Sequence, residues 1–218
     1  FLVMSVLLLG LIVRSYLFRL SMSFSAYGKM NAEQRVLQDI YDGQFDRIVQ
    51  HCDLLSERWL RDPLAAADAA RTAAWCSLNT PQEALRKEWM EQACKYVSIW
   101  TRLGIRKGNP VQLYARYMKQ AREMGSEIYS ALEVADAMGK AVALNPADAR
   151  PRIDYAEMLI DAESSDEALK QLDKAEWLES QLNSESIERF RPEEKWQILA
   201  LRDRAKEMQA MASRPAAS

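Results

Sequence analysis

The sequence is short of glycine, proline, histidine and cysteine, and each shortage argues against a class of protein. Its 218 residues include only 7 glycines and 7 prolines, so few turns are specified, which disfavours a sandwich or barrel of many short strands. One histidine and three cysteines leave little for a metal site or for histidine-based catalysis. The 29 Lys and Arg residues nearly balance the 31 Asp and Glu residues, so bulk charge does not favour nucleic-acid binding.

The few residues with catalytic side chains do not form a recognisable site. Cys52, Cys76 and Cys94 contain no CxxC pair, so we interpret them as small buried side chains on helix faces. His51 and Cys52 are neighbours on a predicted helix, and neighbouring side chains point about 100° apart, so His51 cannot activate the thiol. The sequence therefore predicts a protein that is not an enzyme, with no catalytic residue, no cofactor and no metal.

The main apolar run lies at the N-terminus, where residues 1–13 read FLVMSVLLLGLIV. Thirteen helical residues span roughly 20 Å, less than the ~30 Å hydrocarbon core of a bilayer, and extending the helix to Phe18 places Arg14 inside the span. Arginine near a helix end can extend its charge to the interface. We therefore predict a membrane-anchoring helix that contacts lipid. Its residues are Leu2, Val3, Leu7, Leu8, Leu9, Leu11, Ile12, Arg14 and Arg19.

Two other interpretations of this run remain open, a signal peptide and a buried helix of the fold. Residues 1–30 carry three basic side chains and no acidic one, and the basic residues follow the apolar run. The positive-inside rule then favours a cytoplasmic body, single-pass or after the last helix of a larger protein, with a periplasmic or extracytoplasmic body as the alternative.

After residue 30 the sequence shows helical periodicity and no alternating strand pattern. Along residues 45–61, for example, apolar side chains recur at intervals of three and four. Gly and Pro punctuate the chain at short intervals. The predicted helices are 31–42, 45–61, 64–78, 82–103, 111–124, 127–144, 148–162, 165–181 and 192–211. This order predicts an all-α fold, a solenoid of antiparallel helix pairs preceded by the hydrophobic N-terminal helix.

An internal repeat supports the solenoid. Residues 134–144 align with residues 168–178 at an offset of 34, with identities at Lys140/Lys174, Ala141/Ala175 and Leu144/Leu178. The segment AVALNPADARPRIDYAEMLIDAESSDEALKQLDKAEWL resembles a tetratricopeptide repeat (TPR), whose period is 34 residues. In that register Tyr155, Ala156 and Leu159 pack one helix on its partner, and Ala168, Leu172 and Ala175 permit a close approach of the second helix. The resemblance is good over 134–178 and weaker over 31–131.

The resemblance also implies a binding surface. TPR solenoids bind partners with the concave face of their first helices, which here would present Arg150, Ile153, Glu157 and Ile160. An apolar stripe flanked by opposite charges would suit a peptide or a helix. An exposed tryptophan would mark a contact surface, although most of the six tryptophans are expected in the core.

Three functions fit these observations. The first is a membrane-tethered interaction scaffold or assembly factor that binds a protein. The second is the helical-repeat domain of a larger membrane protein, since a hydrophobic helix before TPR-like helices also resembles the C-terminal extension of O-antigen ligase- and polymerase-type proteins. The third is a structural subunit of a membrane complex. The predicted parts are an anchor and juxtamembrane segment (1–28), a TPR-like domain (29–181), a capping helix (182–212) and a tail (213–218).

The predicted anchor can be tested by its removal. Deleting residues 1–28 should leave a soluble, helical monomer, because the remaining chain would contain the whole repeat domain. Circular dichroism and light scattering would measure helicity and mass. Aggregation or unfolding of the shortened protein would mean that the apolar run belongs to the fold.

Overall fold

The computed structural model describes residue 47 and residues 63–102, 108–182 and 189–213. The chain divides into two compact units, Phe1–Trp59 and Leu60–Ser218, and nearly all the described residues belong to the second. The predicted anchor, the helix predicted over 31–42, all but one residue of the helix predicted over 45–61 and the His51-Cys52 pair lie outside the described residues. Among the helices that are described, none is long and apolar enough to cross a membrane.

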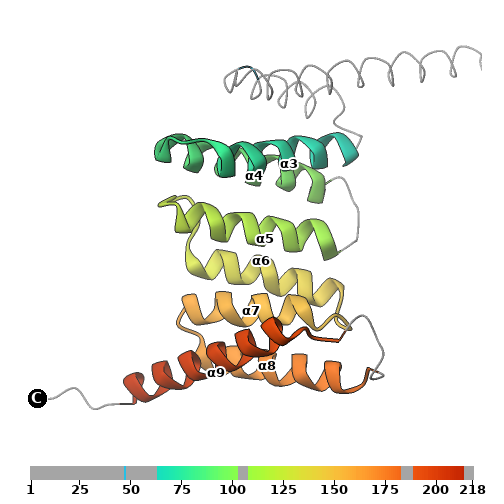
Figure 1. Cartoon of the computed structure of the whole chain (residues 1–218), viewed down its shortest axis with the longest axis vertical. Coiled ribbons are helices and arrows are strands. Elements are labelled where there is room, and N and C mark those ends of the chain that lie inside the picture. The colour runs from blue at the N-terminus through green and yellow to red at the C-terminus, as the bar shows by residue number, and fades with distance from the viewer. Residues whose placement is uncertain (1–46, 48–62, 103–107, 183–188, 214–218) are drawn as a thin grey trace, which may run out of the picture. The chain divides into compact units, whose positions relative to one another are not determined.

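The described part of the second unit is a stack of helices in which each helix packs against the next one along the chain (Figure 1). The described residues contain no strand, so the predicted all-α class is confirmed. The last helix, α9, also contacts α7, two helices earlier. The helices are α3 (Pro63–Asn79), α4 (Glu83–Arg102), α5 (Gly108–Glu123), α6 (Ala131–Leu144), α7 (Arg150–Asp161), α8 (Ser165–Ser180) and α9 (Pro192–Ala212).

Two predicted helix starts are wrong. The helix predicted from residue 127 begins at Ala131, because Ser130 caps it: Ser130 Oγ accepts a hydrogen bond from the Glu133 N–H, and the Glu133 carboxylate accepts one from the Ser130 N–H. The Gly108-Asn109-Pro110 sequence, predicted as a break, instead opens α5. Proline is tolerated there because the N–H groups of a first helical turn have no partner within the helix.

Small side chains bring α7 and α8 together. Ala156, Ala168, Leu172 and Ala175 are fully buried, and Leu159 is 6% exposed. Alanine lets two helix backbones approach closely while losing no side-chain entropy. Tyr155, in contrast, packs toward α6: a Cβ added at Gly139 would lie 3.0 Å from the Tyr155 hydroxyl oxygen. Five of the six packing positions expected from the TPR register are therefore buried, whereas Tyr155 is half-buried and connects this helix pair to the preceding one.

The same turn ends α5 and α7, the first helices of two successive pairs. After α5, Ser126 N–H donates to Ala121 C=O and Gly125 N–H donates to Arg122 C=O, with Gly125 at φ +82°. After α7, Ser164 N–H donates to Leu159 C=O and Glu163 N–H to Ile160 C=O. This is the Schellman motif, which needs a left-handed residue. Glycine supplies it in one pair, and Glu163 at φ +59° supplies it in the other.

This difference predicts opposite effects for two substitutions. Glu163→Gly should stabilise the protein by about 0.5–1 kcal/mol, because relief of left-handed strain exceeds the entropy that glycine adds to the unfolded chain. Gly125→Ala should destabilise it by about 1 kcal/mol through the backbone alone, because a Cβ at Gly125 would meet no atom within 4 Å. Urea unfolding of the full chain would measure both. Shifts in the same direction would contradict this account of the turns.

Candidate functional site

The four predicted groove residues all lie on α7 but differ in exposure. Ile153 is 3% exposed and Ile160 is 1% exposed, so both belong to the core. The side chains of Arg150 and Glu157 are 39% and 30% exposed, and both form ion pairs with other helices. The accessible part of this surface is therefore charged, and its role in partner binding stays a prediction.

Ion pairs join the first helices of successive pairs. The Arg116 side chain of α5 donates twice to Asp154 Oδ2 of α7, at 2.8 and 2.6 Å. Lys119 Nζ of α5 lies 3.2 Å from Glu157 Oε1.

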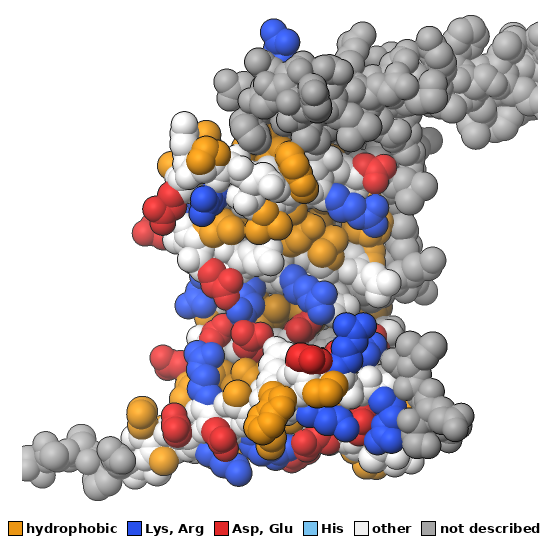
Figure 2. Space-filling model, in the orientation of Figure 1, with side chains coloured by type: hydrophobic (Ala, Val, Ile, Leu, Met, Phe, Trp, Pro, Cys, Tyr) orange, Lys and Arg blue, Asp and Glu red, His pale blue; other side chains and the backbone are white. Residues whose placement is uncertain are grey.

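The same side of α7 pairs with α9. Arg150 Nε lies 2.7 Å from Glu194 Oε1, and Arg204 Nη2 of α9 lies 2.9 Å from Asp161 Oδ1. Residues 150, 154, 157 and 161 recur at helical spacing, so they form one face of α7. We call this surface of α5, α7 and α9 the first-helix face. Figure 2 shows basic and acidic side chains interleaved at the level of α5 and α7.

Exposed aromatic side chains are more numerous than predicted. Of the five described tryptophans, Trp89 is buried and Trp100 is half-buried, whereas Trp75, Trp177 and Trp196 are 43%, 52% and 72% exposed. The expectation that most tryptophans lie in the core is therefore wrong for the described residues. Trp177 is covered on one side by Lys174, whose Nζ lies 3.6 Å from the ring centroid.

Trp75 and Leu78 form an exposed apolar pair on α3 that sequence reasoning did not single out. They follow Arg71 at intervals of four and three residues, so the three share one side of the helix. The positive charge of Arg71 acts on the Tyr117 hydroxyl of α5, whose pKa is raised by burial and lowered in part by that charge. A signal for this apolar pair was present in the sequence: α3 is rich in alanine, and its alanines form the buried side of the helix. Bulky apolar residues at other positions of such a helix are therefore candidates for exposure.

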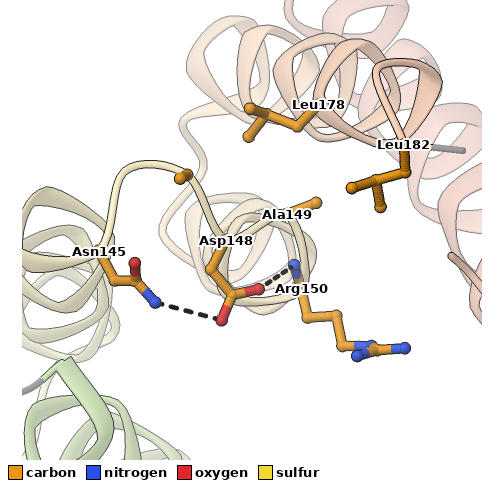
Figure 3. A pocket seen from close by; sticks show the side chains of 7 residues that line it. Asn145, Asp148, Ala149, Arg150, Leu178 and Leu182 are labelled. Carbon is orange, nitrogen blue, oxygen red and sulfur yellow. Dashed lines mark hydrogen bonds between the residues drawn. The ribbon is translucent and has the colours of Figure 1, made fainter. Parts of the chain in front are cut away.

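A pocket of about 290 Å³ lies where the turn before α7 meets the end of α8 (Figure 3). Leu178 and Leu182 form its apolar wall. On the other side, Asp148 accepts hydrogen bonds from the Arg150 N–H at 3.2 Å and from the Asn145 amide at 3.4 Å. Its lining contains no nucleophile beside a base, so the arrangement favours an apolar side chain over a reaction.

The buried thiols of Cys76 and Cys94 have low reactivity. Cys76 and Cys94 are fully buried and free, as predicted for small core side chains, whereas Cys52 lies outside the described residues. Burial raises the pKa of both thiols to about 12, and for Cys94 a hydrogen bond with Tyr129 offsets only part of that rise. Both are therefore thiols at neutral pH and poor nucleophiles. No group of three metal-binding side chains occurs among the described residues.

Glu194 connects α9 to α7 and also caps its own helix. Its Oε1 lies 2.7 Å from Arg150 Nε, and its Oε2 accepts a 2.7 Å hydrogen bond from the Arg191 N–H. Burial alone would raise the pKa of this carboxyl. The hydrogen bonds from Arg150 and Arg191, with their charges, hold the pKa below its ordinary value of 4.5. The folded state therefore favours the ionised carboxylate.

This linkage predicts an acid-sensitive attachment of α9. The stability from Glu194 is complete above about pH 4.5 and is lost as the pH falls through the lower folded-state value. Glu194→Gln should cost up to about 1 kcal/mol at pH 6, since the pair is partly exposed, and much less at pH 3. Urea unfolding at both pH values would measure this. The exposed neighbour substitution Glu193→Gln is the control, and an equal loss at both pH values for Glu194→Gln would contradict the linkage.

Comparison with known proteins gives a likeness of fold only. No protein-family model matches the sequence, and no curated protein matches it significantly. A crystal structure of MamA protein is 12% identical, with a TM-score of 0.50, and the alignment covers 87% of this chain and 97% of that one. TTC0263, a thermophilic TPR protein of Thermus thermophilus, is 16% identical, with a TM-score of 0.48 and coverage of 80% and 78%.

A third similar structure is YrrB, a TPR protein with an unusual peptide-binding site. It is 16% identical, with a TM-score of 0.46 and coverage of 80% and 83%. Residues 150–180 bury their small residues at the TPR packing positions, and each described helix packs against the next one along the chain. The described part of the chain therefore has an all-α, TPR-like helical fold.

Proposed function

We propose that this protein is an interaction scaffold that binds a peptide or helix of a protein partner on its first-helix face, with α3 supplying the apolar anchor. The observations that carry the proposal are the exposed Trp75–Leu78 pair on α3 and the fixed charges of the first-helix face. Tryptophan is enriched among the residues that dominate binding energy at interfaces. Figure 2 shows hydrophobic side chains at the level of α3 to α5, next to the charged band.

The charges of the first-helix face are expected to contribute more to the specificity of partner binding than to its affinity. Arg116, Lys119, Asp154 and Glu157 already neutralise one another within the chain. A partner gains little by adding a further surface ion pair, which typically contributes less than about 1 kcal/mol. Ordered rows of opposite charge can nevertheless set the register and direction of a bound helix. Apolar burial at Trp75 and Leu78 would then supply most of the affinity.

The proposal includes attachment to a membrane through the N-terminal apolar run. Its support is the sequence alone: thirteen nearly uninterrupted apolar residues followed by Arg14 and Arg19. A tether would hold the scaffold close to a membrane-bound partner and raise the effective concentration of the partner at the binding surface.

Site-directed photocrosslinking in native membranes would test the binding surface. A benzoylphenylalanine at Leu78 or at Arg116 should give one or a few discrete protein adducts, because both positions lie on the proposed surface. The same group at exposed Glu88 of α4, a second helix, should not give them. Mass spectrometry of the adducts would identify the partner.

Two matched tryptophan variants make the crosslinking decisive. Trp75→Ala should reduce the adduct yield at Arg116 at least tenfold. Trp177→Ala removes a similarly exposed ring from α8 and should leave the yield unchanged. Equal adducts at Glu88, or yields that do not respond to Trp75→Ala, would show that binding occurs elsewhere.

A further inference from the structure

Arg152 is a buried cation without a carboxylate partner among the described residues. It is 8% exposed and lies in the first turn of α7. Nη1 donates to Gln171 Oε1 at 2.8 Å and Nη2 donates to the Pro146 carbonyl at 2.9 Å, so both acceptors are neutral. The buried Nε has no hydrogen-bond partner. Burial lowers the pKa of the guanidinium, which reflects the cost of holding a charge here without a counter-charge.

The position itself is unusual for this fold. The TPR pattern W-x2-L-G-x2-Y, followed by A-x3-F, places a large aromatic residue three positions before the first packing residue. With Ala156 at the glycine, Leu159 at the tyrosine and Ala168 at the alanine of the pattern, Arg152 falls on the tryptophan. A guanidinium therefore occupies a place that an aromatic ring would fill.

An open hollow of about 580 Å³ borders Arg152, formed by α6, α7, α8 and the turn after α6. Its volume is in the range of ligand pockets. Gly139 contributes no side chain, and the Tyr155 ring lies against it. At the rim, exposed Lys140 contributes a positive charge and exposed Asp136 a negative one.

The guanidinium is held in place before any ligand arrives. Gln171 Oε1 accepts from Arg152, while Gln171 Nε2 donates to Glu167 Oε1 at 2.9 Å. The two contacts fix the amide orientation, because only its oxygen can accept from arginine and only its nitrogen can donate to a carboxylate. Glu167 is therefore linked to Arg152 through the neutral amide of Gln171. A side chain fixed in this way loses little entropy on binding.

We infer that this hollow binds a carboxylate, the acidic side chain of a protein partner, at Arg152. A carboxylate offers planar acceptors that match the guanidinium fork and carries the single negative charge that Arg152 lacks. A phosphate group brings nearly two negative charges, and the acidic side chains of Asp136 at the rim and Glu167 behind Gln171 would oppose the second of them. The site lies on the side of α7 that faces α6 and α8, away from the first-helix face, so it does not depend on the proposed function.

Arginine side-chain NMR of the ¹⁵N-labelled full chain in a non-ionic detergent tests this directly. Arg152→Lys assigns the Arg152 Nε–H signal by its loss. Acetyl-glutamate amide should move that signal saturably, whereas sodium chloride at equal ionic strength should not. Equal movement in chloride, or movement with inorganic phosphate but not with the glutamate compound, would overturn the inference. Acetyl-glycine distinguishes a main-chain carboxylate: binding of that compound alone would overturn the assignment to an acidic side chain.

A substitution at the rim of the hollow tests the site without changing the buried Arg152, whose replacement could affect folding. Lys140→Ala should weaken binding of acetyl-glutamate amide threefold or more and leave thermal unfolding unchanged, because Lys140 is exposed. Lys206→Ala removes an exposed lysine of α9 and should leave the dissociation constant unchanged. Equal constants for the Lys140→Ala variant and the unaltered chain would overturn the site.

Discussion

The close approach of neighbouring helices at small buried residues is the constraint on which the described structure depends. α3 buries alanines at positions 66, 67, 69, 70, 73 and 74, and α7 and α8 meet at Ala156, Ala168 and Ala175. Such contacts are stabilised by dispersion between closely packed backbones. Adding even one methylene group to a side chain at such a contact changes the stability of the protein. Because alanine fills the contacts, the larger side chains must lie elsewhere. Some, such as Met90, Tyr96 and Ile160, are core residues, and others, such as Trp75 and Trp196, remain exposed.

Helical periodicity was sufficient to predict α3, α4, α7, α8 and α9 to within two residues at either end, because each has a boundary signal that is local in sequence. The two starts that differ also have local causes: a capping box at Ser130 begins α6, and Pro110 lies in the first turn of α5 and does not break it. Local sequence therefore held nearly all the information about helix bounds, including where the prediction was wrong.

The candidate sites depended on information that one repeat does not contain. In a single helix pair, Ile153 and Ile160 belong to the outward side of α7. Both are buried in the structure, and other residues of α7 pair with α5 and α9. Arg152 was not recognised because an isolated arginine is usually a surface residue. It contacts α8 and the turn after α6, and its lack of a counter-charge among the described residues becomes visible only in the folded structure.

The two sides of α7 differ in how a charged partner would gain binding free energy. On the first-helix face, Arg150, Asp154, Glu157 and Asp161 all have opposite charges within the chain. A charged partner there must share or replace existing pairs, so affinity has to come from apolar contact and the charges act on register. On the opposite side, the acceptors that Arg152 contacts in the described part of the chain are neutral. A carboxylate there would displace no ion pair among the described residues and would relieve the cost of a buried charge, so a single acidic side chain can contribute favourably to binding.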